Sequence, residues 1–211
     1  LQYVQIFQGE EVMDVADLSN LSGSSGDHPM TVTTNKRRFI TKALLLATGA
    51  THKHLGVPGE SRLSGRGVSY CSTCDGPLFS GQKVVMVGGG DSAVTEALHL
   101  KNIGVDVTVV HWTDKLDAQQ VLADQLINSG IPIIYNSTVK EIIGDKSVEA
   151  VSVYNSLTRA TSRIDAAGIF IAIGYLPSVD LAEKIGVDKT AEGFIKQENY
   201  SPALEHLLKA E

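Results

Sequence analysis

Two cysteines, Cys71 and Cys74, are separated by two residues and followed directly by Asp75. Cysteines at this spacing can close a small disulfide ring, and an adjacent carboxylate can accept or supply the proton that thiol–disulfide exchange must move. We therefore interpret these three residues as a candidate redox centre. Two alternatives remain. The chain has only two cysteines, so a zinc site would need outside ligands or His99 or His111, and two thiols can also simply pack in a core.

A glycine-rich run follows the cysteines and fits the pattern G-x-G-x-x-A at Gly88, Gly90 and Ala93. An apolar, strand-like run precedes it and an apolar helical pattern follows it, which is the context of a dinucleotide site. Small residues let the backbone approach a pyrophosphate, whose charge meets the unpaired amides at the start of the helix. Alone, the pattern could equally be a tight turn. The candidate binding residues are Gly88, Gly89, Gly90, Asp91, Ser92 and Ala93.

The elements around these motifs alternate between strand and helix patterns, which predicts a parallel, Rossmann-like sheet. A run of shorter alternating segments then predicts an antiparallel β-meander, before a buried strand returns. The fold class expected is therefore α/β. Expected strands are 83–88, 106–111, 131–135, 138–143, 148–154, 162–165 and 167–173, and expected helices are 91–103 and 117–129.

The two ends of the chain have different patterns. Strands are expected at 3–7, 11–17, 30–34 and 38–47, with 44–49 as a buried final strand before a hinge. Near the other end, Ser178 and Gly186 are expected to cap and stop a short helix. A strand at 193–197 and a helix at 202–211 complete the prediction.

Five segments taken together closely resemble the low-molecular-weight thioredoxin reductases. They are ATGA at 47–50, LGVPGE at 55–60, GRGVSYCSTCDG at 65–76, GGGDSA at 88–93 and AGIFIAIG at 167–174. The resemblance runs from about Lys42 to Lys196 in the family order. It implies three domain segments. Residues 1–54 would be the rear part of an FAD-binding domain, 55–174 a pyridine-nucleotide-binding domain with the CxxC pair, and 175–211 an incomplete return into the FAD-binding domain.

The resemblance also implies an activity, thioredoxin-disulfide reductase. Electrons would pass from a nicotinamide to FAD, then to the dithiol, then to thioredoxin or a thioredoxin-like protein. Cys74 would face the flavin, Cys71 would attack the partner disulfide, and Asp75 would be the proton-transfer acid. In this family the nucleotide domain swivels about two hinges, matched here by 49–54 and 174–177. Thr48, Gly49, Ile173 and Gly174 would contact cofactors.

The chain departs from the family where the adenosine 2′-phosphate would bind. His111 matches the family's His-Arg-Arg-x-x-x-Arg run, but Trp112, Thr113 and Asp117 replace its three arginines. Without them a phosphate loses its charge-matched clamp, and Asp114 and Asp117 would repel it. Lys115 could supply one positive charge, and the indole of Trp112 could stack on an adenine or cover an altered pocket. NADPH, NADH or another donor therefore remain possible.

Two further stretches, 75–79 and 115–122, are similar to the flavoprotein subunit of alkyl hydroperoxide reductase, an NADH enzyme. That reductase is one alternative function, and a non-catalytic redox-sensing nucleotide-binding module is another. The family's first FAD-binding glycine fingerprint is missing, and so is a later Gly-Asp segment. We therefore expect a fragment or a truncated chain, with an incomplete FAD site.

Composition excludes some other classes. The 211 residues carry a formal net charge of −6 with no dense basic run, which argues against nucleic-acid binding. No segment approaches the roughly 18 consecutive apolar residues that would span a bilayer. A CxxC pair suits a reducing compartment, so a cytoplasmic protein is expected. The family resemblance implies a homodimer for the full-length protein.

Overall fold

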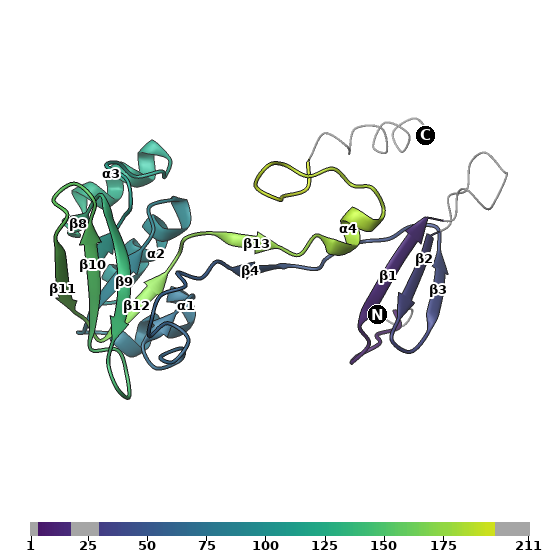
Figure 1. Cartoon of the computed structure of the whole chain (residues 1–211), viewed down its shortest axis with the longest axis horizontal. Helices are drawn as coiled ribbons and strands as arrows, with labels where there is room; N and C mark the ends of the chain where they lie inside the picture. Colours follow the sequence, from purple (N-terminus) through teal and green to yellow (C-terminus); the bar gives the residue numbers. More distant parts are fainter. Residues whose placement is uncertain (1–3, 18–29, 197–211) are drawn as a thin grey trace. The chain divides into compact units, whose positions relative to one another are not determined.

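The computed structural model describes residues 4–17 and 30–196, and the chain divides into two compact units (Figure 1). The first unit contains the chain up to Thr51 and again from Leu176, and the second contains His52–Tyr175. The unit boundaries fall inside the two segments that the sequence marks as hinges. The chain passes between the units through β4 (Ala50–His52) and β13 (Tyr175–Pro177), which form a two-stranded sheet.

The second unit is built on a five-stranded parallel sheet with the order β5-β12-β6-β7-β8. Every neighbouring pair in it is parallel. The strands are β5 (Val68–Ser69), β12 (Gly168–Ile171), β6 (Lys83–Val87), β7 (Asp106–Val110) and β8 (Ile133–Ile134). All five carboxyl ends therefore lie at one edge, where ligands bind in open α/β sheets.

The meander forms a separate antiparallel sheet with the order β11-β10-β9. Its strands are β9 (Ser137–Ile143), β10 (Ala150–Asn155) and β11 (Thr161–Asp165). Helices α2 (Asp91–Asn102) and α3 (Gln120–Asn128) belong to the parallel-sheet region, and α1 (Ser72–Asp75) leads into a 3₁₀ helix at Gly76–Phe79. The expected fold class, a Rossmann-like parallel sheet with an antiparallel meander, is confirmed.

The parallel sheet is buried on both faces, and β6 shows how. Val84 and Met86 belong to one hydrophobic cluster, with Val94, Ala97 and Leu100 of α2 and Leu126 of α3. Val85 and Val87 belong to the other, with Val139 and Ile142 of β9 and Val151 and Val153 of β10. Alternate side chains of a strand point to opposite faces. The helices thus cover one face and the meander covers the other.

The first unit contains a three-stranded antiparallel sheet with the order β1-β2-β3. Its strands are β1 (Val12–Asp17), β2 (Met30–Thr34) and β3 (Arg38–Thr41), and α4 (Asp180–Lys184) contributes to the same unit. The side chain of Lys184 in α4 lies 3.0 Å from the Asp14 carboxylate and donates to the carbonyl of Met13.

Several expectations for the chain ends are wrong. The described part of the first predicted strand, Val4–Phe7, is irregular. The run 44–49 forms no strand, and Leu45 is 90% exposed, because no described strand pairs with it. Ser178 is not the cap of α4. Val179 holds that position, without a side-chain cap bond. In the described part of the predicted 193–197 strand, residues 193–196, Ile195 forms an isolated bridge with Lys189 and no strand is present. The predicted helix at 202–211 lies outside the described residues.

Gly186 does follow the end of α4 with φ +78°, a conformation that favours glycine. In the second unit the errors are small. Helix α3 begins at Gln120 and not at 117, because the amides of Asp117 and Ala118 donate to the carbonyl of Gly89. Within the part of the chain that the structure describes, no helix has both the length and the apolar character that a membrane span needs.

Candidate dithiol and dinucleotide site

The two cysteines are joined by a disulfide at the start of α1. Cys71 is the N-cap residue of this helix, and its Sγ accepts a hydrogen bond from the amide of Cys74 at 3.1 Å. Cys71 is half-buried, whereas Cys74 is exposed. A donor aimed at Cys71 Sγ would stabilise a negative charge there once the disulfide opens. Among the described residues, no group of three or more His, Cys, Asp or Glu side chains could hold a metal ion.

Asp75 is held by a residue that the sequence did not single out, Ser69 at the end of β5. The Ser69 hydroxyl donates to Asp75 Oδ2 at 2.6 Å and accepts from the amide of Cys71 at 3.1 Å. Ser69 is buried, with 5% of its surface exposed. One hydroxyl therefore fixes the candidate acid relative to the backbone of the first cysteine. No sequence signal distinguished this serine from the others, because its role depends on the turn between β5 and α1.

A buried carboxylate, Glu60, anchors the residue just before Cys71. The Tyr70 hydroxyl donates to Glu60 Oε1 at 2.6 Å, and the amides of Leu55 and Gly56 donate to its two oxygens at 2.9 and 2.7 Å. Burial alone would raise the pKa of Glu60, but the hydrogen bonds from Tyr70 and the 55–57 backbone lower the pKa below its usual value. Burial and the nearby carboxylate raise the pKa of Tyr70.

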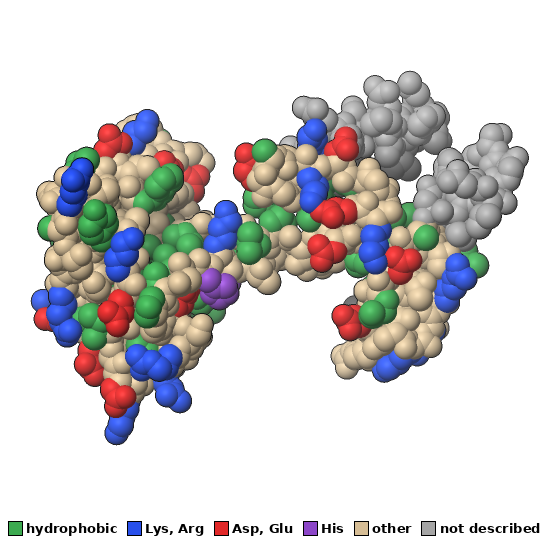
Figure 2. All heavy atoms as spheres, viewed as in Figure 1, with side chains coloured by type: hydrophobic (Ala, Val, Ile, Leu, Met, Phe, Trp, Pro, Cys, Tyr) green, Lys and Arg blue, Asp and Glu red, His purple; other side chains and the backbone are tan. Residues whose placement is uncertain are grey.

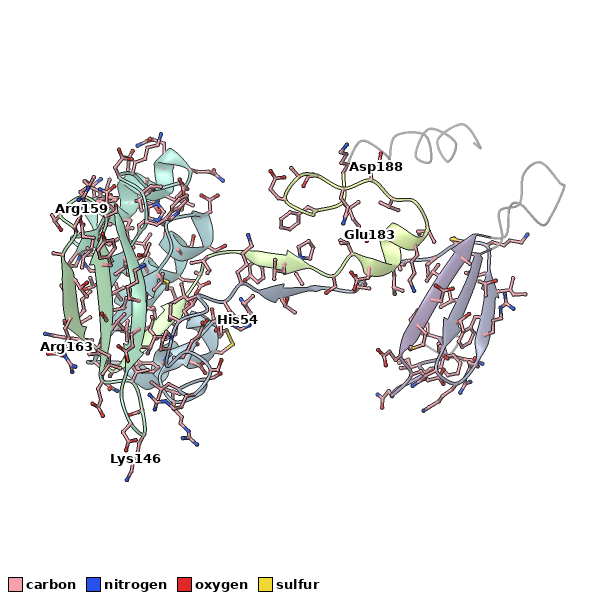
Figure 3. All side chains as sticks on the ribbon, viewed as in Figure 1. His54, Lys146, Arg159, Arg163, Glu183 and Asp188 are labelled. Carbon is pink, nitrogen blue, oxygen red and sulfur yellow. A yellow bond between two sulfur atoms is a disulfide. The ribbon has the colours of Figure 1, made fainter. Side chains whose placement is uncertain are left out.

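His54 completes this network from the exposed side (Figure 3). Its Nδ1 lies 2.7 Å from the Tyr70 hydroxyl and 3.4 Å from Glu60 Oε1. Tyr70 gives its single proton to Glu60, so it must accept from His54 Nδ1, which therefore carries a proton. The ring of His52 packs against Tyr70 and Tyr175, with centroids 5.3 and 4.8 Å away. Tyr70, the residue before Cys71, is thus held by hydrogen bonds to Glu60 and His54 and by ring packing against His52.

The glycine run opens onto a cavity of about 660 Å³. The cavity lies where the loops after β6, β7 and β12 meet. Its lining consists of Gly88, Gly89, Gly90, Asp91, Ser92, Ala93, His111, Trp112, Asp117, Ala118, Gln119, Ala172, Ile173 and Gly174. The structure therefore brings together all the predicted dinucleotide residues of this unit. Thr48 and Gly49 belong to the first unit, where the Thr48 hydroxyl donates to the carbonyl of Ser178 at 2.5 Å.

Each glycine of the run has a different physical reason to lack a side chain. A Cβ on Gly88 would lie 2.3 Å from the carbonyl oxygen of Ala172, and one on Gly89 would lie 2.3 Å from His111 Nδ1. At Gly90, the N-cap of α2, a Cβ would meet nothing within 4 Å. The first two glycines allow close packing, while the third leaves the start of α2 open to a ligand. A pyrophosphate fits such an opening.

His111 and Trp112 follow the end of β7, and they behave differently. His111 is buried, and its Nε2 lies 2.6 Å from the Thr113 hydroxyl and 3.6 Å from Asp117 Oδ2. Its Nδ1 is buried without a hydrogen-bond partner. Trp112 is 66% exposed at the cavity. The cavity lining thus includes three residues of the segment that the family resemblance aligns with the 2′-phosphate site: His111, Trp112 and Asp117.

The dithiol and the cavity share one edge of the sheet. Cys71 follows β5, the glycines follow β6, His111 follows β7 and Ala172 follows β12. Tyr70, next to Cys71, lines a small pocket together with Ser92, Ala172 and Gly174, which also line the large cavity. Parallel strands therefore place a disulfide and a candidate dinucleotide pocket side by side.

Comparison with known proteins agrees with this arrangement. A thioredoxin reductase of Listeria innocua is 42% identical over 167 residues, which cover 78% of this chain and 52% of the relative. One from Bacillus subtilis is 41% identical over the same shares. The chain thus spans about half the length of the curated relatives it matches.

Two solved structures show the same architecture. The thioredoxin reductase of T. acidophilum has a TM-score of 0.76 at 35% identity, covering 92% of this chain and 62% of that one. That of Lactococcus lactis has a TM-score of 0.73 at 37% identity, covering 86% and 58%. The resemblance found in the sequence is confirmed. The family model for pyridine nucleotide-disulphide oxidoreductases matches residues 2–203. The chain therefore belongs to the pyridine nucleotide-disulphide oxidoreductase family.

Proposed function

We propose that this chain is the dithiol and nucleotide-binding part of a flavin-dependent thioredoxin-disulfide reductase. The observation that carries the proposal is the Cys71–Cys74 disulfide beside the glycine-lined cavity, at the same edge of a parallel sheet. The similarity to thioredoxin reductases supports thioredoxin, or a similar small redox protein, as the acceptor. Residues 1–54 and 175–211 would belong to an FAD-binding domain, and 55–174 would form the nucleotide domain.

In the proposed mechanism, residues of this chain transfer protons while two electrons pass from the cofactors to the disulfide and then to thioredoxin. When bound, FAD and a reduced nicotinamide supply the electron pair that opens the Cys71–Cys74 bond. Both sulfurs then become thiols or thiolates, and Asp75 exchanges the proton. The thiolate of Cys71, stabilised by the Cys74 amide, attacks one sulfur of the thioredoxin disulfide and expels the other as a thiolate. Cys74 then attacks Cys71 Sγ, which restores the ring and releases reduced thioredoxin.

Thiol transfer from this chain tests the proposal without any cofactor. The chain is reduced with dithiothreitol, freed of it, and mixed with oxidised thioredoxin under argon. We expect the thiols of thioredoxin to appear as those of the chain disappear. The variant Cys74→Ser should accumulate a covalent adduct on non-reducing gels once free thiols are alkylated, because Cys71 attacks and this chain has no second thiol to resolve the mixed disulfide. The variant Cys71→Ser should form little of this adduct, because it lacks the thiol that attacks thioredoxin.

Each opposite result has a definite meaning. An adduct with Cys71→Ser, and none with Cys74→Ser, would reverse the two cysteine roles. No thiol transfer by the unaltered chain would contradict the proposed acceptor and favour a redox-sensing module. Glutathione disulfide serves as the control acceptor, because its reduction reports the reactivity of the dithiol without protein recognition.

Other expectations for the full-length protein remain proposals. FAD contacts through Thr48 and Gly49, and a homodimeric assembly, are supported only by family likeness. A cytoplasmic location is supported by the CxxC pair, which cycles chemically in reducing compartments. On the face seen in Figure 2, basic and acidic side chains of the second unit are interspersed.

A further inference from the structure

Among the residues that the structure describes, the lining of the large cavity contains a single basic side chain, that of His111. This lining, as described above, includes neither lysine nor arginine, and Lys115, in the same loop as Asp117, does not belong to it. Two carboxylates, Asp91 and Asp117, do line it. A ribose 2′-phosphate is a dianion that needs cationic donors, whereas a free 2′-hydroxyl needs an acceptor. The charge of the lining therefore bears on which nicotinamide dinucleotide can bind.

Both carboxylate oxygens of Asp91 already accept hydrogen bonds from within the protein. Its Oδ1 accepts from the amide of Gln119 at 2.7 Å, and its Oδ2 accepts from the Gln119 side-chain nitrogen at 2.8 Å. These two bonds tie the start of α2 to the loop before α3. Asp91 thus serves as a structural brace, with a carboxylate that adds negative charge to the cavity.

Asp117 differs from Asp91, because its backbone is hydrogen-bonded while its side chain is about half exposed to solvent. The amides of Asp117 and Ala118 donate to the carbonyl of Gly89 at 2.9 and 3.0 Å. The side chain of Asp117 is 53% exposed, and its Oδ2 lies 3.6 Å from His111 Nε2. An acid that binds the ribose usually stands at the end of the second strand, here β7. In this chain the loop brings an acceptor to the glycine run from a position well beyond that strand end.

His111 cannot offer a donor to a phosphate in this arrangement. The Thr113 hydroxyl donates its one proton to the carbonyl of Lys115 at 2.7 Å, so it accepts from His111 Nε2, which carries a proton. That proton points toward Thr113 and Asp117. The other ring nitrogen is buried against Gly89. His111 thus supports the Asp117 loop from inside the protein.

From these contacts we propose that the cavity binds NAD(H) in preference to NADP(H), and that Asp117 makes the choice by accepting a hydrogen bond from the adenosine ribose 2′-hydroxyl. The inference rests on the proposed function, since it names the dinucleotide of that same site. A 2′-phosphate placed there would face a carboxylate, and the described lining of the cavity offers no lysine or arginine to balance it. Asp117 is thus a specificity-determining residue.

Binding to the 211-residue chain can be measured directly, because the chain contains a single tryptophan, Trp112, at the cavity. Its fluorescence is followed while NAD⁺ or NADP⁺ is added, and calorimetry provides an independent dissociation constant. We expect NAD⁺ to bind about ten- to a hundred-fold more tightly, the range that a hydrogen bond to a charged group supplies.

Two substitutions and one control sharpen the test. Asp117→Asn keeps the shape of the side chain and removes its charge. It should weaken the binding of NAD⁺ and reduce the preference for NAD⁺ over NADP⁺. Asp117→Arg should reverse the preference toward NADP⁺. The sequence also set Asp114 against a 2′-phosphate, but the structure places this exposed acid outside the cavity lining, so Asp114→Asn should leave both constants unchanged.

The outcomes separate this inference from the proposed function. Equal or tighter binding of NADP⁺ by the unaltered chain would overturn the inference, as would an unchanged preference in Asp117→Asn. Binding of neither dinucleotide would also overturn it. Thiol transfer to thioredoxin needs no dinucleotide, so it would persist in all three cases. Loss of thiol transfer with an intact NAD⁺ preference would instead contradict the proposed function alone.

Discussion

Glu60 is a carboxylate, a residue type that is mostly exposed, yet it is only 4% exposed. Three donors, the Tyr70 hydroxyl and the amides of Leu55 and Gly56, surround its two oxygens. Such an arrangement requires the ionised form, because each oxygen accepts and neither donates. Glu60 fixes Tyr70 and hence the approach to Cys71, so its charge state matters to the dithiol as well as to stability.

Replacing Glu60 with glutamine should destabilise the protein at pH 7 by about 1–3 kcal/mol, because an amide NH₂ would face a backbone or tyrosine donor. The folded pKa of Glu60 is lowered, so its stabilisation is complete above the unfolded value near 4.5 and is lost as pH falls through the folded pKa. The difference between wild type and Glu60→Gln should therefore shrink in acid. Urea unfolding at neutral and acidic pH measures it.

The control for this prediction is Glu141→Gln, at an exposed position of β9. Its effect should stay within about 0.5 kcal/mol at every pH, as for most surface substitutions. If Glu60→Gln behaved like the control, or if its cost grew toward acid pH, the charged network around Glu60 would not contribute in the way its hydrogen bonds indicate.

At the scale of elements, the strand-glycine-helix unit from β6 to α2 could be predicted because its periodicity and its small residues are local signals. The apolar alternation of 83–87 and the helical spacing after Gly90 are visible in one short window. The short pieces could not be predicted. Strand β5 has two residues and α1 has four, too few for any periodicity, and they form because tertiary neighbours hold them.

The same reasoning explains which site residues escaped sequence analysis. Cys71, Cys74 and the glycines have distinctive types and spacing. Ser69 and Glu60 act through hydrogen bonds that exist only after folding. Asp117 could be seen as an acid where the family has arginine, but its place beside Gly89 depends on a loop that folds back across the sheet edge. The apolar run 44–49 was wrongly predicted to be a buried strand. Burial of a strand needs a partner strand as well as an apolar composition, and no described strand pairs with this run.

The glycine run allows a contrast between two neighbouring positions. Gly89→Ala places a methyl group against the buried ring of His111, so it should cost about 1–3 kcal/mol and disturb the Asp117 loop. Gly90→Ala meets no atom within 4 Å and has φ −83°, so stability should change little. Its methyl group would instead block the close approach of a pyrophosphate to the helix start.

Unfolding measurements and NAD⁺ titrations of both variants separate these roles. We expect Gly89→Ala to lower the unfolding midpoint, and Gly90→Ala to weaken binding about tenfold or more while unfolding normally. Full NAD⁺ affinity in Gly90→Ala would mean that the pyrophosphate lies away from the start of α2. An unchanged midpoint in Gly89→Ala would mean that His111 can move aside freely.

At the scale of the whole molecule, the two units have very different cores. Both hydrophobic clusters, from Leu55 to Ile173, lie entirely within the second unit. The dithiol, the Glu60 network and the large cavity lie there too. In the described part of the first unit, the fully buried apolar side chains are Val15 and Ala182. The chain therefore concentrates both its stability and its candidate chemistry in one continuous segment.

Residues 52–175 produced alone should consequently fold, unfold in one cooperative transition and bind NAD⁺ with the affinity of the longer chain. Because no member of either cluster is removed, the unfolding midpoint should shift by no more than about 5 °C. Urea and thermal unfolding followed by circular dichroism, with the Trp112 titration, provide the comparison. A broad transition or lost NAD⁺ binding would show that the second unit depends on the first for its fold. A sharp transition with intact binding would show that the first unit contributes nothing to the dinucleotide pocket.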